Sequence, residues 1–527
     1  MFKVLVADAI KPDGLTPFIG REDIAVVQKT VEEVRNELHE FDALLVRSAT
    51  KVTDALLDRM TSLKIVARAG VGVDNIDVPS CTKRGIIVVN APDGNTISTA
   101  EHTFAMIASL ARNIPQAHQT VKGGGWERNR FAGTELKGKT LGIVGMGRIG
   151  SELTKRARAF QMDVFAFDPF LTAERAKELQ VSTGTLEELM AVSDFITVHT
   201  PLTKDTRGLF NRDTIQLCKD GVYLINCARG GIIDEEALYE AIESGKVAGA
   251  ALDVFVEEPP VDNRLLNLNQ IIVTPHLGAS TKEAQLNVAK QVAKEVVSFV
   301  DGIPVSNSIN LPAIPAELFN RIQPYYQLVK TVGSFLSQFI QEGIKEISVT
   351  YGGDTFDYDT SILTKALVSG FFKGRVDVNV NEVNALLYAK ERSITIGEKI
   401  SNESHGYSSS LTVKIVGETK TMEVKATYIK EYGPRIFAIN DFKIDFYPEG
   451  HILYIQHHDR PGVIGVVGKK LGDMNLNIAT MQVGRKEAGG EAIMVLTFDE
   501  EIPEDALSDL AASQELSIVQ GIELPAY

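Results

Sequence analysis

The alternation of short apolar runs with helical stretches is the feature that most restricts the fold of this chain. Residues 1–98 contain four β-branched runs bounded by Gly, Pro or Asp: KVLVAD, ALLVRS, KIVARAG and IIVVNAP. A second series of six runs occupies residues 140–276: TLGIVG, DVFAFD, FITVHTP, VYLINCA, GAALDVF and IIVTPH. Strands that alternate with helices form βαβ units, whose strands run parallel. The sequence therefore predicts two α/β domains, the second with a six-stranded, doubly wound parallel sheet.

Two helical patterns connect these series. Apolar residues recur at helical spacing from about Ser98 to Arg112, and Pro115 is expected to end that helix before a glycine-rich loop, KGGGWERNRFAG. A second helix, from Thr281 to about Val300, would lead back toward the first domain. We therefore expect one domain to comprise residues 1–98 and 283–310, and a second domain to comprise residues 99–282.

Two smaller units are expected beyond the Pro-punctuated linker at residues 308–317. The runs EISVTY, VDVNV, LTVKIV and EVKATY predict an α+β domain with antiparallel pairing over residues 318–450. Residues 451–527 show the order strand, helix, strand, strand, helix, strand. A chain of 527 residues is too long for one hydrophobic core, which agrees with several domains.

Composition excludes several classes of protein. With 44% apolar and 23% charged residues, the chain is typical of globular proteins, and its net charge of −15 disfavours a nucleic-acid or anionic-membrane partner. We find neither a membrane-length apolar run nor a signal sequence, so we expect a cytoplasmic location. The three cysteines lack C-x-x-C spacing, so neither a disulfide framework nor a metal site is expected.

The glycine pattern Gly145-x-Gly147-x-x-Gly150 lies between the run TLGIV and the start of a helical pattern. The first glycine permits a tight turn, the second lets the backbone approach a pyrophosphate, and the third allows close packing of helix on strand. The free N–H groups at a helix N-terminus favour the phosphate. The next strand ends in Asp168, where a carboxylate would bind a ribose 2′-hydroxyl and repel a 2′-phosphate. The pattern therefore predicts a site for NAD rather than NADP.

Three other strands of the second series end in residues that packing alone would not select. LINCARGG ends in Arg229, AALDVFVEEPP contains Asp253, Glu257 and Glu258, and IIVTPHLGAS contains His276. In an open α/β sheet, ligands bind beyond the carboxyl ends of the strands. A histidine can remove the hydroxyl proton during hydride transfer, a carboxylate can fix its tautomer, and a guanidinium can hold a substrate carboxylate. These residues therefore predict a dehydrogenase active site.

The combination of NCARGGIIDE, LDVFVEEPP, TPHLGAST and GIVGMGRIG resembles the D-isomer-specific 2-hydroxyacid dehydrogenases. The chain is most similar to the long branch with an intervening domain and a C-terminal ACT domain. The resemblance implies a Rossmann-type NAD domain and a flavodoxin-like substrate domain. It further implies NAD-dependent oxidation of 3-phospho-D-glycerate to 3-phosphooxypyruvate, the first step of L-serine biosynthesis, by a homo-oligomer, expected to be a tetramer.

Carried over residue by residue, the resemblance implies a catalytic set of Arg229, Glu258 and His276, with Glu258 rather than Glu257 as the partner of the histidine. It implies cofactor contacts from Gly145, Gly147, Arg148, Ile149, Gly150, Asp168, Thr200, Cys227, Ala228, Arg229, Asp253, His276, Leu277, Gly278 and Ala279. It implies substrate contacts from Arg47, Arg68, Val71 and Asn95, with the two arginines at the phosphate. The loop at residues 126–130 is expected to cross to the site of a partner subunit.

The stretch HHDRPGVIGVVGKKLGDMNLNIATM resembles an ACT domain, which implies L-serine as an effector bound by His457, Asp459 and Asn477. Two other functions stay open. One is a different D-2-hydroxyacid dehydrogenase, such as a glyoxylate or hydroxypyruvate reductase, and the other is an NAD-sensing corepressor-like binding protein. The ACT stretch and the two arginines disfavour the first, and the ACT stretch and the acidic net charge disfavour the second.

Overall fold

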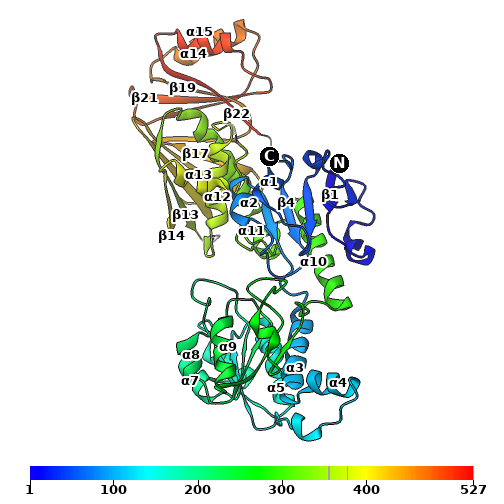
Figure 1. Ribbon diagram of the computed structural model, residues 1–527. Helices are drawn as coiled ribbons and strands as arrows, with labels where there is room; N and C mark the ends of the chain where they lie inside the picture. Colours follow the sequence, from blue (N-terminus) through cyan, green and yellow to red (C-terminus); the bar gives the residue numbers. More distant parts are fainter. Residues whose placement is uncertain (354–355, 377, 526–527) are drawn as a thin grey trace.

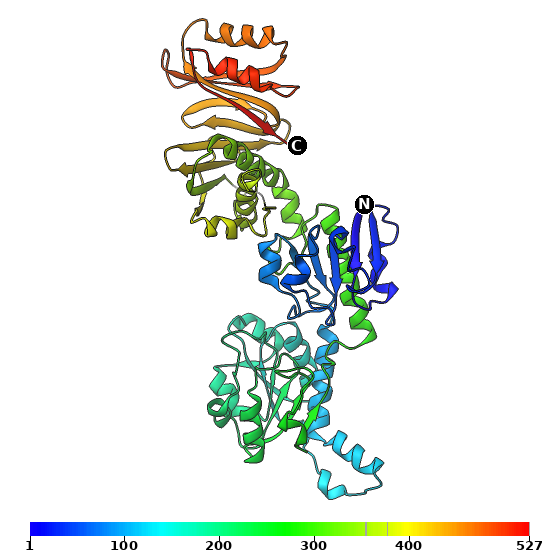
Figure 2. The same cartoon turned by 45° about the horizontal axis from the view of Figure 1, so that its top comes forward.

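The residues that the structure describes form four sheets. The computed structural model describes residues 1–353, 356–376 and 378–525. The sheet of the N-terminal residues lies between the second sheet and the third, and the C-terminal sheet is farthest from the second (Figure 1, Figure 2). This arrangement gives an elongated molecule in which the first two sheets are neighbours.

The first sheet has five parallel strands in the order β2-β1-β3-β4-β5, which is the flavodoxin-like order expected from the resemblance. Its strands are β1 (Phe2–Val6), β2 (Ile24–Gln28), β3 (Ala43–Val46), β4 (Ile65–Arg68) and β5 (Ile87–Val89). It carries the helices η1 (Pro12–Phe18), η2 (Leu38–Glu40), α1 (Asp54–Leu57), α2 (Val78–Lys83) and α10 (Lys282–Val300). Helix α10 packs on the sheet through Val288, Val292 and Val296, so the chain returns to the first sheet at this helix.

The second sheet has seven parallel strands in the order β12-β11-β10-β9-β6-β7-β8. The six predicted strands are present as β6 (Thr140–Val144), β7 (Asp163–Phe167), β9 (Phe195–Val198), β10 (Val222–Asn226), β11 (Val247–Leu252) and β12 (Ile271–Val273). The seventh, β8 (Ser182–Thr183), pairs with Phe165 and Ala166 at the edge. Two exposed polar residues carry no apolar periodicity, and the sequence therefore gave no sign of this strand.

Helices cover both faces of the second sheet. One face packs on α3 (Thr96–Ala111) and α5 (Arg148–Ala159), and the opposite face packs on α7 (Leu186–Val192) and α9 (Glu235–Glu243). The remaining helices are α4 (Ile114–Lys122), η3 (Arg128–Phe131), α6 (Ala173–Leu179), α8 (Arg212–Gln216) and η4 (Arg264–Asn267). Helix α3 ends at Ala111, ahead of Pro115. Pro115 itself lies in the first turn of α4, where a backbone N–H would have no partner within the helix, so its absence breaks no hydrogen bond. The predicted doubly wound fold is confirmed.

The third sheet is mixed, in the order β14-β13-β15-β16-β17-β18. The expectation of antiparallel pairing is wrong for β13 and β14, which are parallel. The strand expected at residues 376–380 is not formed by the described residues 376 and 378–380, and residue 377 lies outside the described part. The strands are β13 (Ile344–Gly353), β14 (Thr395–Ser401), β15 (Ser409–Gly417), β16 (Thr421–Ile429), β17 (Gly433–Ile439) and β18 (Phe442–Phe446), with helices α11 (Ala316–Phe339), α12 (Ser361–Phe372) and α13 (Ala385–Glu391).

The C-terminal part has the predicted βαββαβ order, folded into an antiparallel sheet in the order β20-β21-β19-β22. Its elements are β19 (Gly450–His458), α14 (Val463–Asp473), β20 (Ile478–Arg485), β21 (Glu491–Phe498), α15 (Glu504–Ala511) and β22 (Leu516–Leu524). In the part of the chain that the structure describes, no helix combines the length and the apolar character needed to span a bilayer.

Candidate active site

The glycine turn between β6 and α5 has the geometry that a pyrophosphate site requires. Gly145 has a φ of 99°, and a Cβ there would lie 2.6 Å from the carbonyl oxygen of His199. A Cβ at Gly150 would collide with the carbonyl oxygen of Gly145, whereas a Cβ at Gly147 would meet no atom within 4 Å. The backbone at Gly145 and Gly150 therefore leaves no room for a side chain, whereas the absence of a side chain at Gly147 leaves open space at the N-terminus of α5.

Asp168 follows β7 beside the same turn. Its Oδ2 accepts a hydrogen bond of 2.7 Å from the backbone N–H of Met146, and its Oδ1 accepts one of 2.8 Å from Phe170. These bonds fix the carboxylate next to the glycine turn. Arg148, the first residue of α5, pairs through Nε with Asp93 Oδ1 at 2.6 Å, so it links the second domain to the first.

A cavity of about 410 Å³ opens between the first two domains. It brings together eleven of the predicted site residues, namely Val71, Asn95, Ile149, Thr200, Cys227, Ala228, Arg229, Asp253, His276, Gly278 and Ala279. Three side-chain atoms of this lining are buried without a hydrogen-bond partner among the described residues: Asn95 Oδ1, His199 Nδ1 and Thr200 Oγ1. Buried polar atoms of this kind are normally satisfied by a ligand or water. The cavity and the open glycine turn therefore fit a dinucleotide.

His276 and Glu258 form a hydrogen-bonded pair at one end of this cavity. His276 Nδ1 lies 2.8 Å from Glu258 Oε2, and Glu258 Oε1 accepts from the backbone N–H of Phe255 at 3.2 Å. Because an ionised carboxylate can only accept, Nδ1 carries the proton and Nε2 is left as the acceptor of the neutral ring. Glu258, and not Glu257, is the residue that the structure places on the imidazole.

The loop that carries His276 is held from behind by Asp253. Leu277 and Gly278 donate their backbone N–H groups to the Asp253 carboxylate at 2.7 and 2.9 Å, and Thr274 donates its hydroxyl at 2.6 Å. These bonds stabilise a backbone in which His276 has a φ of 55°, an uncommon value for a residue other than glycine. Asp253 therefore fixes the direction in which the imidazole leaves the chain.

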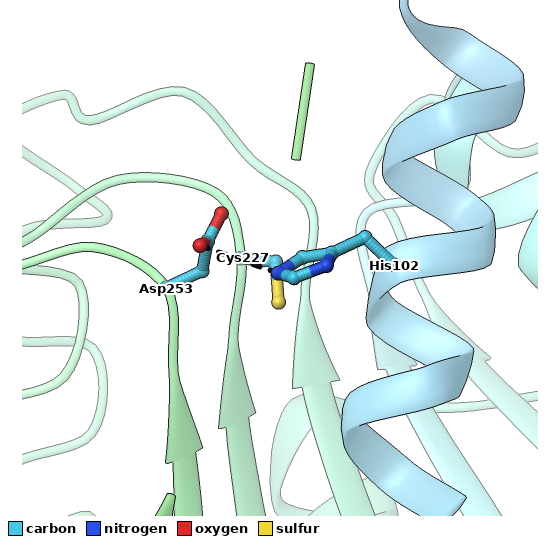
Figure 3. Close-up of side chains that lie close together, drawn as sticks. All are labelled: His102, Cys227 and Asp253. Atoms are coloured by element: carbon cyan, nitrogen blue, oxygen red, sulfur yellow. Dashed lines mark ion pairs between the residues drawn. The ribbon is translucent and has the colours of Figure 1, made fainter. Parts of the chain in front are cut away.

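His102 on α3 completes this support (Figure 3). Its Nε2 lies 3.2 Å from Asp253 Oδ1. Cys227 Sγ is close to both side chains, and one polar atom from each of the three residues lies within 4.8 Å of the other two. Burial alone would raise the pKa of Asp253, but hydrogen bonds from His102, Thr274 and Leu277 hold it below its usual value. Burial raises the pKa of the Cys227 thiol to about 12, so the thiol stays protonated and unreactive.

Arg229 lies at the end of β10, facing the first domain. Its Nε is 3.2 Å from the carboxylate of Asp74, and a Cβ at Gly72 would overlap its guanidinium. The guanidinium therefore rests directly on the backbone of the loop that connects β4 to α2. Gly72, in the opposite lobe, provides the space that the cation needs at the mouth of its strand.

Arg68 and Arg47 lie at the ends of β4 and β3 in the first domain and are not among the residues that line this cavity; Arg47 lines a separate pocket. The guanidinium of Arg68 rests on Gly70, and its Nε donates to Asn75 Oδ1 at 3.2 Å. Burial lowers the pKa of Arg68, and the nearby cations Arg229 and Arg47 lower it further. A cluster of three arginines that repel one another is a site that an anion would stabilise.

The residues expected to bind an effector lie far from this cavity, in the C-terminal domain. His457 is buried, and its Nε2 has no hydrogen-bond partner among the described residues. Asp459 accepts from Arg485 at 2.9 Å, and this hydrogen bond holds the pKa of the carboxyl below its usual value. Asn477 is exposed, ahead of β20. The structure therefore does not bring these three side chains into one hydrogen-bonded group.

Four residues at the site were missed from the sequence: Asp74, Asn75, His102 and His199. Each of them contacts a residue that is distant in the chain or lines the cavity. His102, for example, contacts Asp253. Asp74 and Asn75 lie in the loop after the predicted run KIVARAG, and His199 lies at the end of the run FITVHTP. This position is the only signal that could have marked these three residues. His102 lies within a helix and carried no such signal.

Comparisons with known proteins show the family of the chain. Family models match the chain in three places: the NAD binding domain of the D-isomer specific 2-hydroxyacid dehydrogenases at residues 104–278, the D-3-phosphoglycerate dehydrogenase intervening domain at residues 321–440, and the ACT domain at residues 451–513. Among solved structures, a D-lactate dehydrogenase from Aquifex aeolicus complexed with NAD and lactic acid is similar, with 33% identity and a TM-score of 0.53. That match covers 59% of this chain and 100% of the other.

Two relatives are similar along their whole length. The D-3-phosphoglycerate dehydrogenase of Bacillus subtilis (strain 168) is 58% identical over 525 residues, which is 100% of both chains. The enzyme of the same name from Archaeoglobus fulgidus is 44% identical over 516 residues, covering 96% of this chain and 97% of the relative. The chain therefore belongs to the D-3-phosphoglycerate dehydrogenases, a branch of the NAD-dependent D-isomer-specific 2-hydroxyacid dehydrogenases.

Proposed function

We propose that this chain oxidises 3-phospho-D-glycerate to 3-phosphooxypyruvate with NAD⁺. The observation that carries the proposal is one cavity lined by both His276 and Arg229, next to an open dinucleotide turn. NAD⁺, when bound, supplies the acceptor for the hydride that leaves C2 of the substrate. Gly145, Gly147 and Gly150 at the turn and the carboxylate of Asp168 are the groups that would hold its pyrophosphate and ribose.

The proton and the charges of the reaction are assigned to three side chains. His276 Nε2 accepts the proton of the C2 hydroxyl, because Nδ1 is already committed to Glu258 at 2.8 Å. Glu258 stabilises the imidazolium that forms. Arg229 binds the substrate carboxylate and polarises the C2 oxygen. The backbone N–H groups near Val71, beside the contact of the guanidinium with Gly72, would supply further donors to the carboxylate.

Two arginines contact the β4–α2 loop, and the distance between their contact points supports a phosphorylated substrate. Arg229 rests on Gly72 and Arg68 rests on Gly70, two residues along the chain. Two residues span at most about 7 Å, which suits a three-carbon acid with a carboxylate at one end and a phosphate at the other. Arg47, at the end of the neighbouring strand, adds a third cation on the phosphate side.

A direct assay tests the proposal. The purified chain should reduce NAD⁺ with 3-phospho-D-glycerate at a kcat/KM far above that with D-glycerate or D-lactate. His276→Ala should lower kcat by about 10²-fold or more while NAD⁺ still binds, because proton removal is lost and the cofactor turn is untouched. Turnover of D-lactate as fast as that of the phosphorylated acid would contradict the substrate assignment.

We also propose L-serine as the effector of the ACT domain. Gly462, with a φ of 98°, opens α14, and the buried Nε2 of His457 provides a polar group without a partner among the described residues. The helix N-terminus would receive the serine carboxylate, and Asp459 its ammonium. Inhibition by L-serine that disappears in Asp459→Ala would support this assignment, and inhibition that is unchanged in the variant would contradict it.

We further propose a homo-oligomer, expected to be a tetramer, in which α4 and the loop after it cover a second copy. Helix α4 has no buried residue, and Ile114, Val121 and Trp126 are exposed. Exposed apolar side chains on one projecting segment favour a protein contact. Light scattering on Trp126→Ala and on the unchanged chain would measure the assembly, and a monomeric unchanged chain would contradict the proposal.

A further inference from the structure

Asn75 ties together the two loops that carry the arginines of the first domain. Its Oδ1 accepts from Arg68 Nε at 3.2 Å, and its Nδ2 donates to the carbonyl oxygens of Arg47 and Thr50 at 2.7 and 2.6 Å. Its backbone carbonyl accepts from Val52 at 2.8 Å. One half-buried amide therefore connects the end of β4 with the whole turn that follows β3.

The bond from Asn75 decides which way the Arg68 guanidinium faces. Nε is the donor nearest the side-chain stem, so a bond there leaves both terminal NH₂ groups for a ligand. Among the described residues, no acceptor is bound to these two groups. The guanidinium is kept against Gly70, two residues from the Arg229 contact at Gly72. Asn75 thus orients Arg68 and leaves its positive charge intact. A carboxylate at this position would neutralise that charge.

Asp8 fixes the other side of the turn after β3. Its carboxylate accepts from the backbone N–H of Arg47 at 2.5 Å and from the Thr50 hydroxyl at 2.6 Å. The turn therefore has its N–H groups bound by Asp8 and its carbonyl groups bound by Asn75. Asn75 therefore adds a side-chain link between the Arg47 turn and Arg68, beyond the β3–β4 pairing that ends at Val46 and Arg68.

We propose that Asn75 is a positioning residue that aims Arg68 and the Arg47 turn at the phosphate of the substrate. The proposal rests on the proposed function and deepens it, because it concerns recognition of the phosphate and not the hydride step. Only an amide has one acceptor and two donors in this geometry. An aspartate would keep the acceptor but would place a second oxygen against two carbonyl oxygens and a negative charge beside Arg68.

The test compares two substrates that differ only in the phosphate. The reverse reaction is followed with NADH and either 3-phosphooxypyruvate or hydroxypyruvate. Asn75→Ala should raise the KM for 3-phosphooxypyruvate about tenfold and change the KM for hydroxypyruvate less than about twofold. Asn75→Asp should raise the first KM further, because it also offsets the charge of Arg68. Equal changes for the two substrates, or no change for either, would overturn the proposal.

A double-mutant cycle separates positioning from a general loss of stability. In an Arg68→Ala background, Asn75→Ala should raise the KM for 3-phosphooxypyruvate less than about threefold, because much of its effect passes through Arg68. Fully additive effects would overturn the assignment. The matched control is Asn211→Ala, which removes four side-chain hydrogen bonds but lies at the start of α8 in the second domain. It should lower the melting temperature without changing the ratio of the two KM values.

A different outcome would concern the proposed function alone. If the unchanged chain had equal KM values for 3-phosphooxypyruvate and hydroxypyruvate, the phosphate would not be recognised at all, and the substrate assignment would fail before any variant is compared. If the unchanged chain prefers the phosphorylated substrate and Asn75→Ala keeps that preference in full, the substrate assignment stands and the role of Asn75 falls.

Discussion

At the scale of single residues, a carboxylate beside His276 determines which ring nitrogen is free to act as a base. The bond from Nδ1 to Glu258 is 2.8 Å long, although both side chains are partly exposed, with 49% and 39% of their surface accessible. An exposed ion pair contributes little to stability. In the proposed mechanism the pair therefore acts on the chemistry and not on stability, since a bound substrate that excludes water would strengthen it.

Glu258→Gln should lower kcat by about 10²-fold, because a neutral amide no longer stabilises the imidazolium and can select the wrong tautomer. The thermal midpoint of unfolding should change little. Glu257→Gln is the matched control, since this neighbouring carboxylate is exposed and is not bonded to the imidazole. Equal losses of kcat in both variants, measured under saturating substrate, would contradict the role of Glu258.

His199 gives the second prediction at this scale, on pH. Burial lowers its pKa from 6.5 to about 4, so the folded chain keeps it neutral while the unfolded chain protonates it below pH 6.5. The unfolded state then binds more protons, and stability falls as the pH drops from about 6.5 toward 4. Between pH 8 and pH 5 the loss should be about 2 kcal/mol. His199→Gln should show a smaller decrease in melting temperature over this range, measured without cofactor.

The exposed residue His118 provides the control, since His118→Gln should keep the full pH dependence of the unchanged chain. A His199→Gln protein that loses as much stability at pH 5 as the unchanged chain would show that the imidazole is accessible to protons in the folded state.

At the scale of elements, the sequence predicted best where one strand or helix carries its own periodicity. All six apolar runs of the second series became strands, and Arg229, Asp253 and His276, which follow three of them, line one cavity. The sequence could not predict the supporting residues of the site, because they act through contacts with distant residues. Examples are the contacts of Asn75 with Arg47 and of His102 with Asp253. Helix α11 was missed because it follows directly on a Pro-rich linker and contains Pro324.

The glycine turn before α5 offers a prediction that separates folding from binding. Gly147→Ala places its methyl group in open space, so the protein should fold but bind NAD⁺ about tenfold more weakly. Gly150→Ala drives its methyl group into the Gly145 carbonyl and should cost about 1–3 kcal/mol of stability. Calorimetric titration with NAD⁺ and thermal unfolding would check the two effects. The reverse pattern would contradict the roles given to the two glycines.

At the scale of the whole molecule, the third domain contacts the first at the C-terminal end of α2. Asn381 Nδ2 donates to the carbonyl of Gly85 at 2.7 Å, and Asn384 Nδ2 donates to that of Lys83 at 3.3 Å. Gly85 has a φ of 72°, which turns the chain directly into β5. Through these two hydrogen bonds the third domain contacts the lobe that carries the arginine cluster.

Asn381→Ala should leave the kcat/KM for 3-phospho-D-glycerate within about twofold of the unchanged chain but weaken the proposed inhibition by L-serine, because a contact between the third domain and the first is lost. Asn402→Ala, at an exposed position of the third domain, is the control. Dose–response curves for L-serine would measure the effect. Unaltered inhibition in Asn381→Ala would mean that the signal passes by another route.

The path of the backbone between the two lobes has a mechanical consequence. Helix α3 leaves the first domain, and α10 returns to it, so the dinucleotide lobe is inserted within the other and two covalent crossings join them. A body attached at two points swings about the line through those points and resists twisting. Any relative movement of the two lobes is thereby restricted to rotation about one axis. A protease that cuts one crossing would leave the lobes joined by the other.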